Sequence, residues 1–320
     1  MSAITEPLAA GRLTSDRRQP GERVFAGVSR AAGIGILVIL AAVASFLIAQ
    51  AAPALAAPGS ALPFGDFWAY AIPLAFGTVW SAFLAMLVAV PVSIGIALFI
   101  SHYAPRRLAT VIGYVMDLLA AVPSVVFGLW GINTLAVTLQ PAYAWLNATF
   151  GDAPVLGLFF GGTASGTGRT ILTASAVLAI MVLPIITSLC REVFLQTPRL
   201  HEEASLALGA TKWEMIRQAV LPFGRSGIVS ACMLGLGRAL GETMAVAMVL
   251  SPANVISLLL LTSTNPNTIA ANIALNFPEA FGLGQNQLIA TGLVLFVITL
   301  AVNMLARAIL RRRAEFSGAD

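Results

Sequence analysis

The sequence predicts an all-α integral membrane protein with six transmembrane helices and both termini in the cytoplasm. Hydrophobic residues make up 58% of the 320 residues and charged residues 10%, and the mean hydropathy is +0.89. This composition lies far outside that of soluble domains. Six runs with few or no charges are long enough to cross the hydrocarbon core, which takes about 20 residues of helix. The placement of the basic residues gives the orientation.

Polar or proline-rich segments separate the six apolar runs. The predicted spans cover approximately residues 31–52, 73–100, 109–137, 170–190, 226–250 and 288–310. Because proline cannot donate a backbone hydrogen bond, we expect Pro53 to end the first span and Pro91 to kink the second. We interpret the first span as a retained helix, since a cleavable signal peptide would have a shorter apolar core nearer the N-terminus.

These spans divide the chain into four parts. Residues 1–30, with five arginines among Pro, Gly and Ser, are predicted to be a disordered cytoplasmic arm. Residues 31–66 form the first transmembrane helix and an external loop, and residues 67–313 form a core with five transmembrane helices. Residues 314–320 are a cytoplasmic tail. Within the core, the apolar piece 255–261 is too short to span and is expected to be re-entrant or interfacial.

The basic residues indicate which side of the membrane each loop faces. With both termini inside, sixteen of the eighteen Lys and Arg residues fall on the cytoplasmic side. The two exceptions are Arg169, at an outer boundary, and Arg238, inside the fifth span. Because cytoplasmic loops carry an excess of Lys and Arg, this orientation is strongly favoured over the opposite one.

The polar segment between the fourth and fifth spans, residues 191–225, is predicted to be a helix–glycine–helix loop. Good helix formers precede Gly209, which stands where a left-handed C-terminal cap is typical. Thr211 and Glu214 have the spacing of a capping box, and Leu221-Pro222 is expected to stop the helix that they start. One face of this second helix is apolar. Such a loop either docks on a partner or is an ordinary amphipathic loop.

The same segment resembles the EAA loop of the permease subunits of ATP-binding-cassette importers. The resemblance rests on Glu203-Ala204-Ser205, on Gly209 six positions after the glutamate, and on Leu221-Pro222. Ser205 and Ala219 depart from the usual alanine and isoleucine, but the helix–glycine–helix frame is kept. The resemblance implies the type I permease architecture of these importers. It also implies a coupling helix that sits in a groove of a cytoplasmic ATPase subunit.

Two charged residues in the fifth span are the leading candidates for an anion route. Arg238 lies about twelve residues into the span, roughly 18 Å at 1.5 Å per residue, which is close to the membrane midplane. An intramembrane charge is costly and usually functional. Glu242 is four residues further and is expected to pair with Arg238 on one helix face. Arg238 then offers a fork of donors to an oxyanion. The alternative is an ion pair that only stabilises helix packing.

The string from Gly237 to Val246, GRALGETMAV, resembles the corresponding helix of phosphate importer permeases of the PstC type. Sulfate and molybdate permeases share a similar RALGE core, so the core itself indicates an oxyanion. The strings at residues 120–131 and 172–175 also resemble the PstC-type pattern and favour phosphate. The resemblance covers about residues 67–313. It implies a bacterial inner membrane, a second similar permease, two ATPase subunits and an external phosphate-binding protein.

Three further polar residues in the spans are weaker candidates. Ser124 and Thr243 can donate hydroxyl hydrogen bonds to an anion, although such residues more often bond to carbonyls of their own helix. Asp117, on the third span, is expected to have a structural or gating role, because a carboxylate repels phosphate.

The sequence argues against catalysis, nucleic-acid binding and a cofactor in this chain. No GxxxxGK[ST] motif occurs, and Lys212 is the only lysine, so ATP and its Mg²⁺ are expected to be bound by a partner ATPase. Neither His/Cys metal-ligand spacing nor a catalytic triad is evident, and Cys190 and Cys232 are expected to be inert thiols. A stand-alone secondary anion transporter remains an alternative, although it would be expected to have coupling-ion acids near the midplane.

Overall fold

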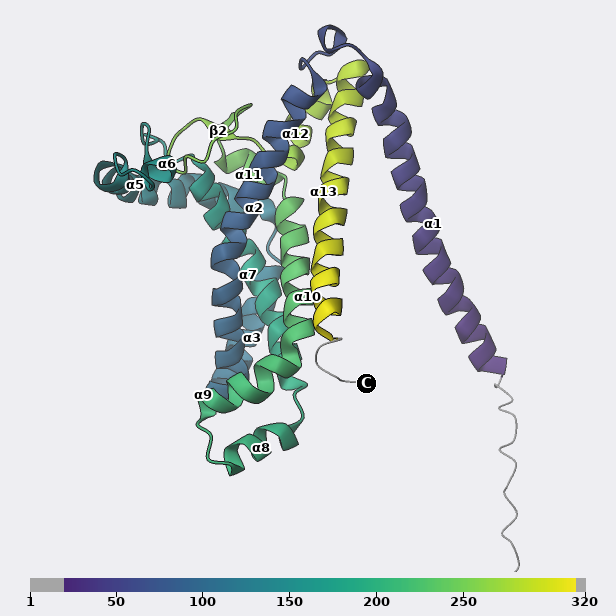
Figure 1. The fold of residues 1–320 in the computed structure, drawn as a ribbon, viewed down its shortest axis with the longest axis vertical. Coiled ribbons are helices and arrows are strands. Elements are labelled where there is room, and N and C mark those ends of the chain that lie inside the picture. The colour runs from purple at the N-terminus through teal and green to yellow at the C-terminus, as the bar shows by residue number, and fades with distance from the viewer. Residues whose placement is uncertain (1–19, 315–320) are drawn as a thin grey trace, which may run out of the picture. The chain divides into compact units, whose positions relative to one another are not determined.

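The computed structural model describes residues 20–314 and is mostly helical in that part (Figure 1). Residues up to Phe46 and residues from Leu47 form two separate units. The α-helices are α1 (Pro20–Ala56), α2 (Phe67–Leu98), α3 (Arg106–Ala120), α4 (Ser124–Trp130), α5 (Ala136–Phe150), α6 (Gly157–Phe160), α7 (Ile171–Leu195), α8 (Arg199–Ala207), α9 (Lys212–Met215), α10 (Leu221–Leu240), α11 (Met244–Val249), α12 (Ile269–Asn276) and α13 (Leu283–Ala314).

Shorter elements join these helices. Three are π-helical turns, η2 (Phe99–Tyr103), η3 (Gly131–Leu135) and η4 (Ile216–Val220), and two are 3-10 turns, η1 (Gly59–Ala61) and η5 (Phe277–Glu279). Two short strands, β1 (Pro252–Ala253) and β2 (Asn265–Pro266), pair in parallel. Within residues 20–314, six helical stretches are long and apolar enough to cross a membrane, as the sequence predicts.

The first helix is longer than predicted. It begins at Pro20, so the expectation of disorder is wrong for residues 20–30, and residues 1–19 lie outside the described part of the chain. The expected stop at Pro53 is also wrong, because Pro53 lies inside the helix and its carbonyl accepts a hydrogen bond from the backbone N–H of Ala57 at 3.1 Å. A proline so near the end of an apolar helix removes one hydrogen bond without breaking the helix.

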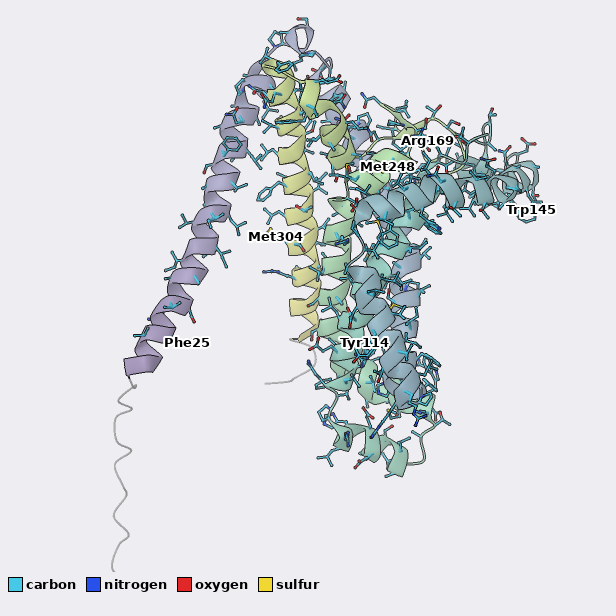
Figure 2. The ribbon with its side chains drawn as sticks, turned by 180° about the vertical axis from the view of Figure 1, so that it is seen from behind. Phe25, Tyr114, Trp145, Arg169, Met248 and Met304 are labelled. Atoms are coloured by element: carbon cyan, nitrogen blue, oxygen red, sulfur yellow. The ribbon has the colours of Figure 1, made fainter. Side chains whose placement is uncertain are left out.

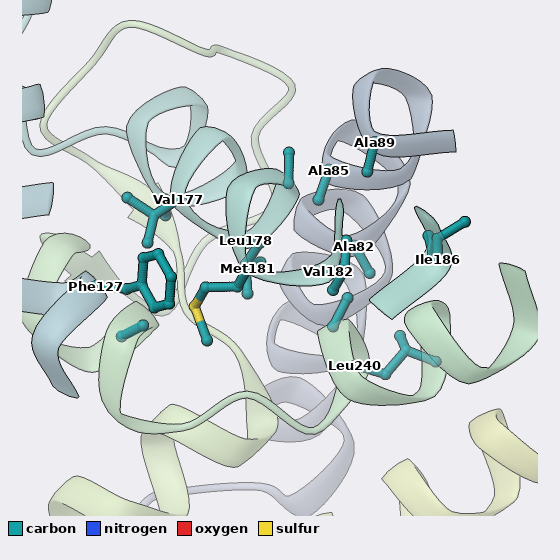
Figure 3. Packing of buried hydrophobic residues seen from close by; sticks show 14 of the residues in the cluster. Ala82, Ala85, Ala89, Phe127, Val177, Leu178, Met181, Val182, Ile186 and Leu240 are labelled. Atoms are coloured by element: carbon teal, nitrogen blue, oxygen red, sulfur yellow. The ribbon is translucent and has the colours of Figure 1, made fainter. Parts of the chain in front are cut away.

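The core of the bundle is the packing of α2 against α7. Ala82, Ala85 and Ala89 of α2 are buried in the main apolar cluster together with Val182 and Ile186 of α7 (Figure 3). Alanines at this spacing give α2 a face of small side chains, which lets the two backbones approach closely.

Polar and glycine contacts tie α7 to both of its neighbours. The Ser93 hydroxyl on α2 donates a hydrogen bond to the carbonyl of Leu183 on α7 at 3.1 Å. On α10, a Cβ built on Gly235 would lie 2.6 Å from Cδ1 of Ile186, so only glycine permits this approach of α10 to α7. The helix α7 is therefore held between α2 and α10.

The third predicted span, residues 109–137, is not one helix. The structure ends α3 at Ala120, turns through Ala121-Val122-Pro123 and starts α4 at Ser124. Pro123 explains the break, because its ring disfavours the helical conformation of Val122 and its nitrogen has no hydrogen to donate. The membrane-length stretch is instead residues 124–150, which run through η3 into α5. Figure 1 shows α5 extending sideways from α2, α7 and α10.

The fifth predicted span, residues 226–250, is also interrupted. Helix α10 ends at Leu240, and α11 begins only at Met244, after Gly241-Glu242-Thr243. At the other end, the expected stop at Leu221-Pro222 is wrong, because η4 leads directly into α10. Pro222 comes directly after the π-helical turn η4, and such a local widening of the helix accommodates a proline that cannot donate a backbone hydrogen bond. The membrane-length helix is residues 212–240.

The end of the bundle opposite α8 is closed by side chains that satisfy free backbone groups. The guanidinium Nη2 of Arg169 donates to the carbonyls of Met248 at 3.2 Å and Leu250 at 2.9 Å, which end α11. Figure 2 shows Arg169 and Met248 at this end. The buried side chain of Asn265 accepts from the backbone N–H of Ile171 at 2.9 Å and donates to the carbonyl of Arg169 at 3.1 Å. The charge of Arg169 is therefore stabilised by backbone carbonyls at the end of α11, which indicates a structural role for this arginine.

Candidate functional site

The two helix interruptions meet at one open cavity of about 570 Å³. The first break contributes Ala120 to Ser124, and the second contributes Gly237, Arg238, Gly241 and Glu242. Residues more than a hundred positions apart in the sequence are thus brought to one place. Ser124, Arg238 and Glu242, all candidates for the anion route, line this cavity together.

Two glycines keep the two breaks together. A Cβ on Gly128 of α4 would lie 3.1 Å from the Cα of Ala245 on α11, so these helices touch backbone to backbone. A Cβ on Gly131 would lie 2.7 Å from Val177 and 2.9 Å from Val249. The segment after the first break is therefore packed against the segment after the second.

Arg238 and Glu242 line the same cavity without forming an ion pair. Among residues 24–308, whose side chains the structure describes, His102 and Glu202 form the one ion pair, so the expected pairing of Arg238 with Glu242 is wrong. The reason is the end of α10 at Leu240, which removes the helical spacing that would bring side chains four residues apart together. The Glu242 carboxylate instead accepts a hydrogen bond from the backbone N–H of Ala245 at 3.1 Å and caps α11.

The two charges differ in exposure. Glu242 is 8% exposed, whereas Arg238 is an exposed side chain in the last turn of α10. In the part of the chain that the structure describes, the Arg238 guanidinium makes no hydrogen bond to a protein group. Because Arg238 lines the cavity, its donors are available there to an anion, which can accept them in a fork.

Of the other predicted residues, one belongs to the cavity lining and two do not. Ser124 is half-buried and belongs to the cavity lining. Thr243 is half-buried in the second break, but it is not part of the lining. Asp117 is exposed on α3, one turn before the first break, and has no ion-pair partner among the side chains of residues 24–308. The proposed gating role of Asp117 remains a prediction.

The predicted coupling loop, residues 191–225, has the helix–glycine–helix form that the sequence indicates. Gly209 adopts a φ of +87°, which is the left-handed region that favours glycine, and it follows α8. The capping box is also present, with the Thr211 N–H 2.8 Å from Oε2 of Glu214 and the Glu214 N–H 3.3 Å from Oγ1 of Thr211. Glu203 and Ala204 lie on α8, and Leu221 and Pro222 open α10.

The loop also presents apolar side chains to its surroundings. Leu208 is 90% exposed beside Gly209, and Trp213 is 54% exposed on α9. Both side chains are therefore accessible at the turn between the two helices of the loop.

A contact that the sequence does not reveal joins this loop to the end of α2. The Nε2 of His102 lies 3.4 Å from Oε1 of Glu202, and the Lys212 ammonium lies 5.0 Å from the centre of the Tyr103 ring. His102 and Tyr103 belong to η2 at the end of α2. Glu202 and Lys212 belong to the coupling loop. Because His102 and Glu202 are a hundred residues apart, only the fold brings them together.

Comparison with known proteins shows the family to which the chain belongs. The model of the family described as "Binding-protein-dependent transport system inner membrane component" matches residues 89–315. This chain belongs to that family. As an inner membrane component with six membrane-length helices, it is a multi-pass protein of the bacterial inner membrane.

Curated relatives of this transport component are similar over nearly the whole chain. The phosphate transport system permease protein PstC 2 of Mycobacterium tuberculosis is 46% identical over 96% of this chain and 98% of its own length. PstC of Mesorhizobium japonicum is 40% identical over 100% of both chains. PstC of Pasteurella multocida is 36% identical over 93% of this chain and 94% of its own length. Among solved structures, an amino acid ABC transporter has a TM-score of 0.49 at 18% identity, covering 76% of this chain and 94% of its own.

The family match covers most of the helical bundle. It begins inside α2 and includes α7, the coupling loop and both helix interruptions, whereas α1 lies outside it. The sequence resemblance to importer permeases is therefore confirmed as family membership.

Proposed function

We propose that this chain is a permease subunit of an ATP-driven importer that moves inorganic phosphate into the cytoplasm. The observation that supports it most is the fork of Arg238, unpaired among the described residues, at a cavity formed where two helices are interrupted. The names of the relatives, which are phosphate transport system permeases, support the substrate. An unpaired guanidinium inside a membrane-spanning helix is costly, and a passing anion offsets that cost.

The environment of Glu242 favours phosphate over sulfate. At neutral pH phosphate carries at least one proton, so it can donate a hydrogen bond to a carboxylate, whereas fully ionised sulfate has no proton to donate. Glu242 is held beside Arg238 in the cavity lining by its bond to Ala245. A phosphate on Arg238 can therefore bond to Glu242, while sulfate is repelled by it. Ser124 supplies a further hydroxyl, and Thr243 and Asp117 act indirectly, Asp117 in gating.

The coupling loop supports the partners of such an importer. Glu203, Ala204, Gly209, Leu221 and Pro222 belong to the loop that docks on a cytoplasmic ATPase subunit, and its exposed Leu208 and Trp213 supply the apolar contact. Both termini are then cytoplasmic. A second similar permease, two ATPase subunits and an external phosphate-binding protein complete the assembly. The ATPase subunits bind ATP and Mg²⁺, and this chain has no ATP site and no catalytic activity of its own.

Uptake by the assembled complex tests this proposal. Proteoliposomes that hold the complex would be given labelled phosphate and the external binding protein, with ATP on the ATPase side and an excess of unlabelled competitor outside. We expect ATP-dependent uptake that phosphate and arsenate suppress and that sulfate and molybdate leave unchanged. Suppression by sulfate or molybdate would show that the substrate is another oxyanion. Uptake by this chain without ATP or partners would identify a secondary transporter and refute the proposal.

A further inference from the structure

A second cavity of about 710 Å³ opens on the other side of Arg238, between α10 and α13. These two helices run side by side (Figure 1). The cavity shares Gly237 and Arg238 with the first cavity, and it extends along α10 to Ser230, which is about 12 Å closer to the coupling loop at 1.5 Å per residue. Arg238 therefore stands between two cavities.

The facing side of α13 supplies a second guanidinium to this cavity. Asn303 and Arg307 are four residues apart, so they lie on one face of the helix, and both line the cavity. Across from them, Ser230 and Arg238 line it from α10. No acidic residue belongs to the lining, and neither arginine has an ion-pair partner in the described part of the chain. The cavity therefore has two positive charges and neutral hydrogen-bonding groups but no counter-charge.

We propose that this cavity binds a tetrahedral phosphate group, held by Arg307 and Arg238 with Asn303 and Ser230 as neutral partners. Two guanidinium forks on opposite walls match the several acceptor oxygens of such a group. The group is either free phosphate that has passed Arg238 or the headgroup of an anionic lipid that enters between the helices. The route of free phosphate rests on the proposed function, whereas occupancy of the cavity does not.

Arg307 also stands near the end of the last span, a place that is typical of a basic residue that reaches the headgroup region and fixes orientation. That role requires neither Asn303 one turn earlier nor a shared cavity with Arg238. The spacing of four between the asparagine and the arginine is the sequence signal for a polar face on this helix.

Protection of an engineered cysteine in the lining measures occupancy directly. Ala306→Cys places a thiol in the cavity wall, in a background with Cys190→Ala and Cys232→Ala. The full complex would be held in nanodiscs, and the rate of labelling by a neutral maleimide would be measured. One set of nanodiscs contains only phosphatidylcholine, with or without inorganic phosphate, and a second set contains phosphatidic acid.

Binding slows the labelling in proportion to occupancy. At phosphate ten times its Kd, we expect labelling about ten-fold slower, because the free fraction falls as the inverse of one plus the ratio of ligand to Kd. Slowing by phosphate in the neutral nanodiscs identifies the free anion, and slowing only with phosphatidic acid identifies a lipid headgroup. Equal labelling rates in all three samples overturn the proposal.

Variants separate specific binding from a general charge effect. Arg307→Gln should abolish the protection, and Arg107→Gln, an exposed residue at the start of α3 outside the lining, should leave it intact. Arg307→Lys keeps the charge but loses the planar fork, so it should weaken protection. This variant replaces Arg307→Gln in the test if the complex with Arg307→Gln fails to assemble. Full protection in Arg307→Gln would overturn the assignment. Protection in a complex that imports no phosphate would refute the proposed function while leaving this site in place.

Discussion

Arg238 and Glu242 share a cavity lining four residues apart, yet the carboxylate bonds to the backbone N–H of Ala245 at 3.1 Å rather than to the guanidinium. A carboxylate that is bound to a helix end is fixed in position. A guanidinium with no counter-charge is available to an anion. The interruption of the helix thus separates two groups that a continuous helix would neutralise.

The fixed carboxylate should matter for selectivity more than for assembly. Glu242→Gln keeps an oxygen acceptor for the Ala245 N–H and removes the negative charge. We expect sulfate to begin to compete with phosphate for uptake while the complex assembles normally. Glu242→Ala also removes the cap and should destabilise the α11 end by about 1 kcal/mol.

Competition assays on both variants would check this expectation. If Glu242→Gln keeps the same ratio of phosphate to sulfate inhibition as the parent complex, the carboxylate has no part in discrimination.

Contact between the two interrupted helices should control the cavity from a distance. A methyl group on Gly128 would meet the backbone of Ala245 at 3.1 Å, so Gly128→Ala should move α4 away from α11 and reduce phosphate uptake without touching Arg238. Gly95→Ala, whose added Cβ meets nothing within 4 Å, is the matched control and should leave uptake unchanged. Equal uptake by the two variants would show that this packing does not set the cavity.

The left-handed turn at Gly209 should be needed for coupling. Its φ of +87° costs a non-glycine residue about 1–2 kcal/mol, so Gly209→Ala should weaken stimulation of the ATPase by the loaded binding protein. Gly209→Pro should abolish it, because proline is fixed at a negative φ. Gly166→Ala, at a glycine without positive φ and with open space around its Cβ, is the control. ATPase activity measured with and without binding protein distinguishes these cases, and full stimulation in Gly209→Pro would contradict the docking role.

The alanine face of α2 should be intolerant of larger side chains. Ala85 is fully buried in the cluster between α2 and α7, so Ala85→Leu should cost about 1–3 kcal/mol through overpacking. Val88, which is exposed on the same helix, provides the control in Val88→Leu. Thermal unfolding of the detergent-solubilised complex would measure both variants. Equal transition temperatures would show that this contact tolerates added volume.

The sequence predicts the helices well where the pattern is local. The number of membrane-length helices, the left-handed Gly209 and the capping box of Thr211 and Glu214 depend on hydropathy or on residues within a few positions, and the structure confirms all three. The interruptions at Pro123 and Glu242 were missed because both lie inside continuous apolar runs, where hydropathy alone cannot distinguish a break from a helix.

Three of the predicted candidates come together in the structure, but their geometry could not be predicted. Arg238, Glu242 and Ser124 stood out as polar residues in apolar runs, and the structure brings them to one cavity. Their arrangement depends on where two helices end, which tertiary packing decides through Gly128 and Gly131. The place of Arg307 beside Arg238 could not be predicted either, since nothing local in the sequence indicates that α13 faces Arg238.

The most direct test of the account is the ratio of phosphate imported to ATP hydrolysed by the complex with Arg238→Ala. Arg238 lies on the proposed route, far from the coupling loop, so we expect ATP hydrolysis to continue while uptake falls. Loss of hydrogen bonds to a charged group costs about 1.5–3 kcal/mol, which corresponds to about a ten- to hundred-fold loss of uptake. Unchanged uptake per ATP in an assembled Arg238→Ala complex would contradict the central claim that the anion passes this arginine.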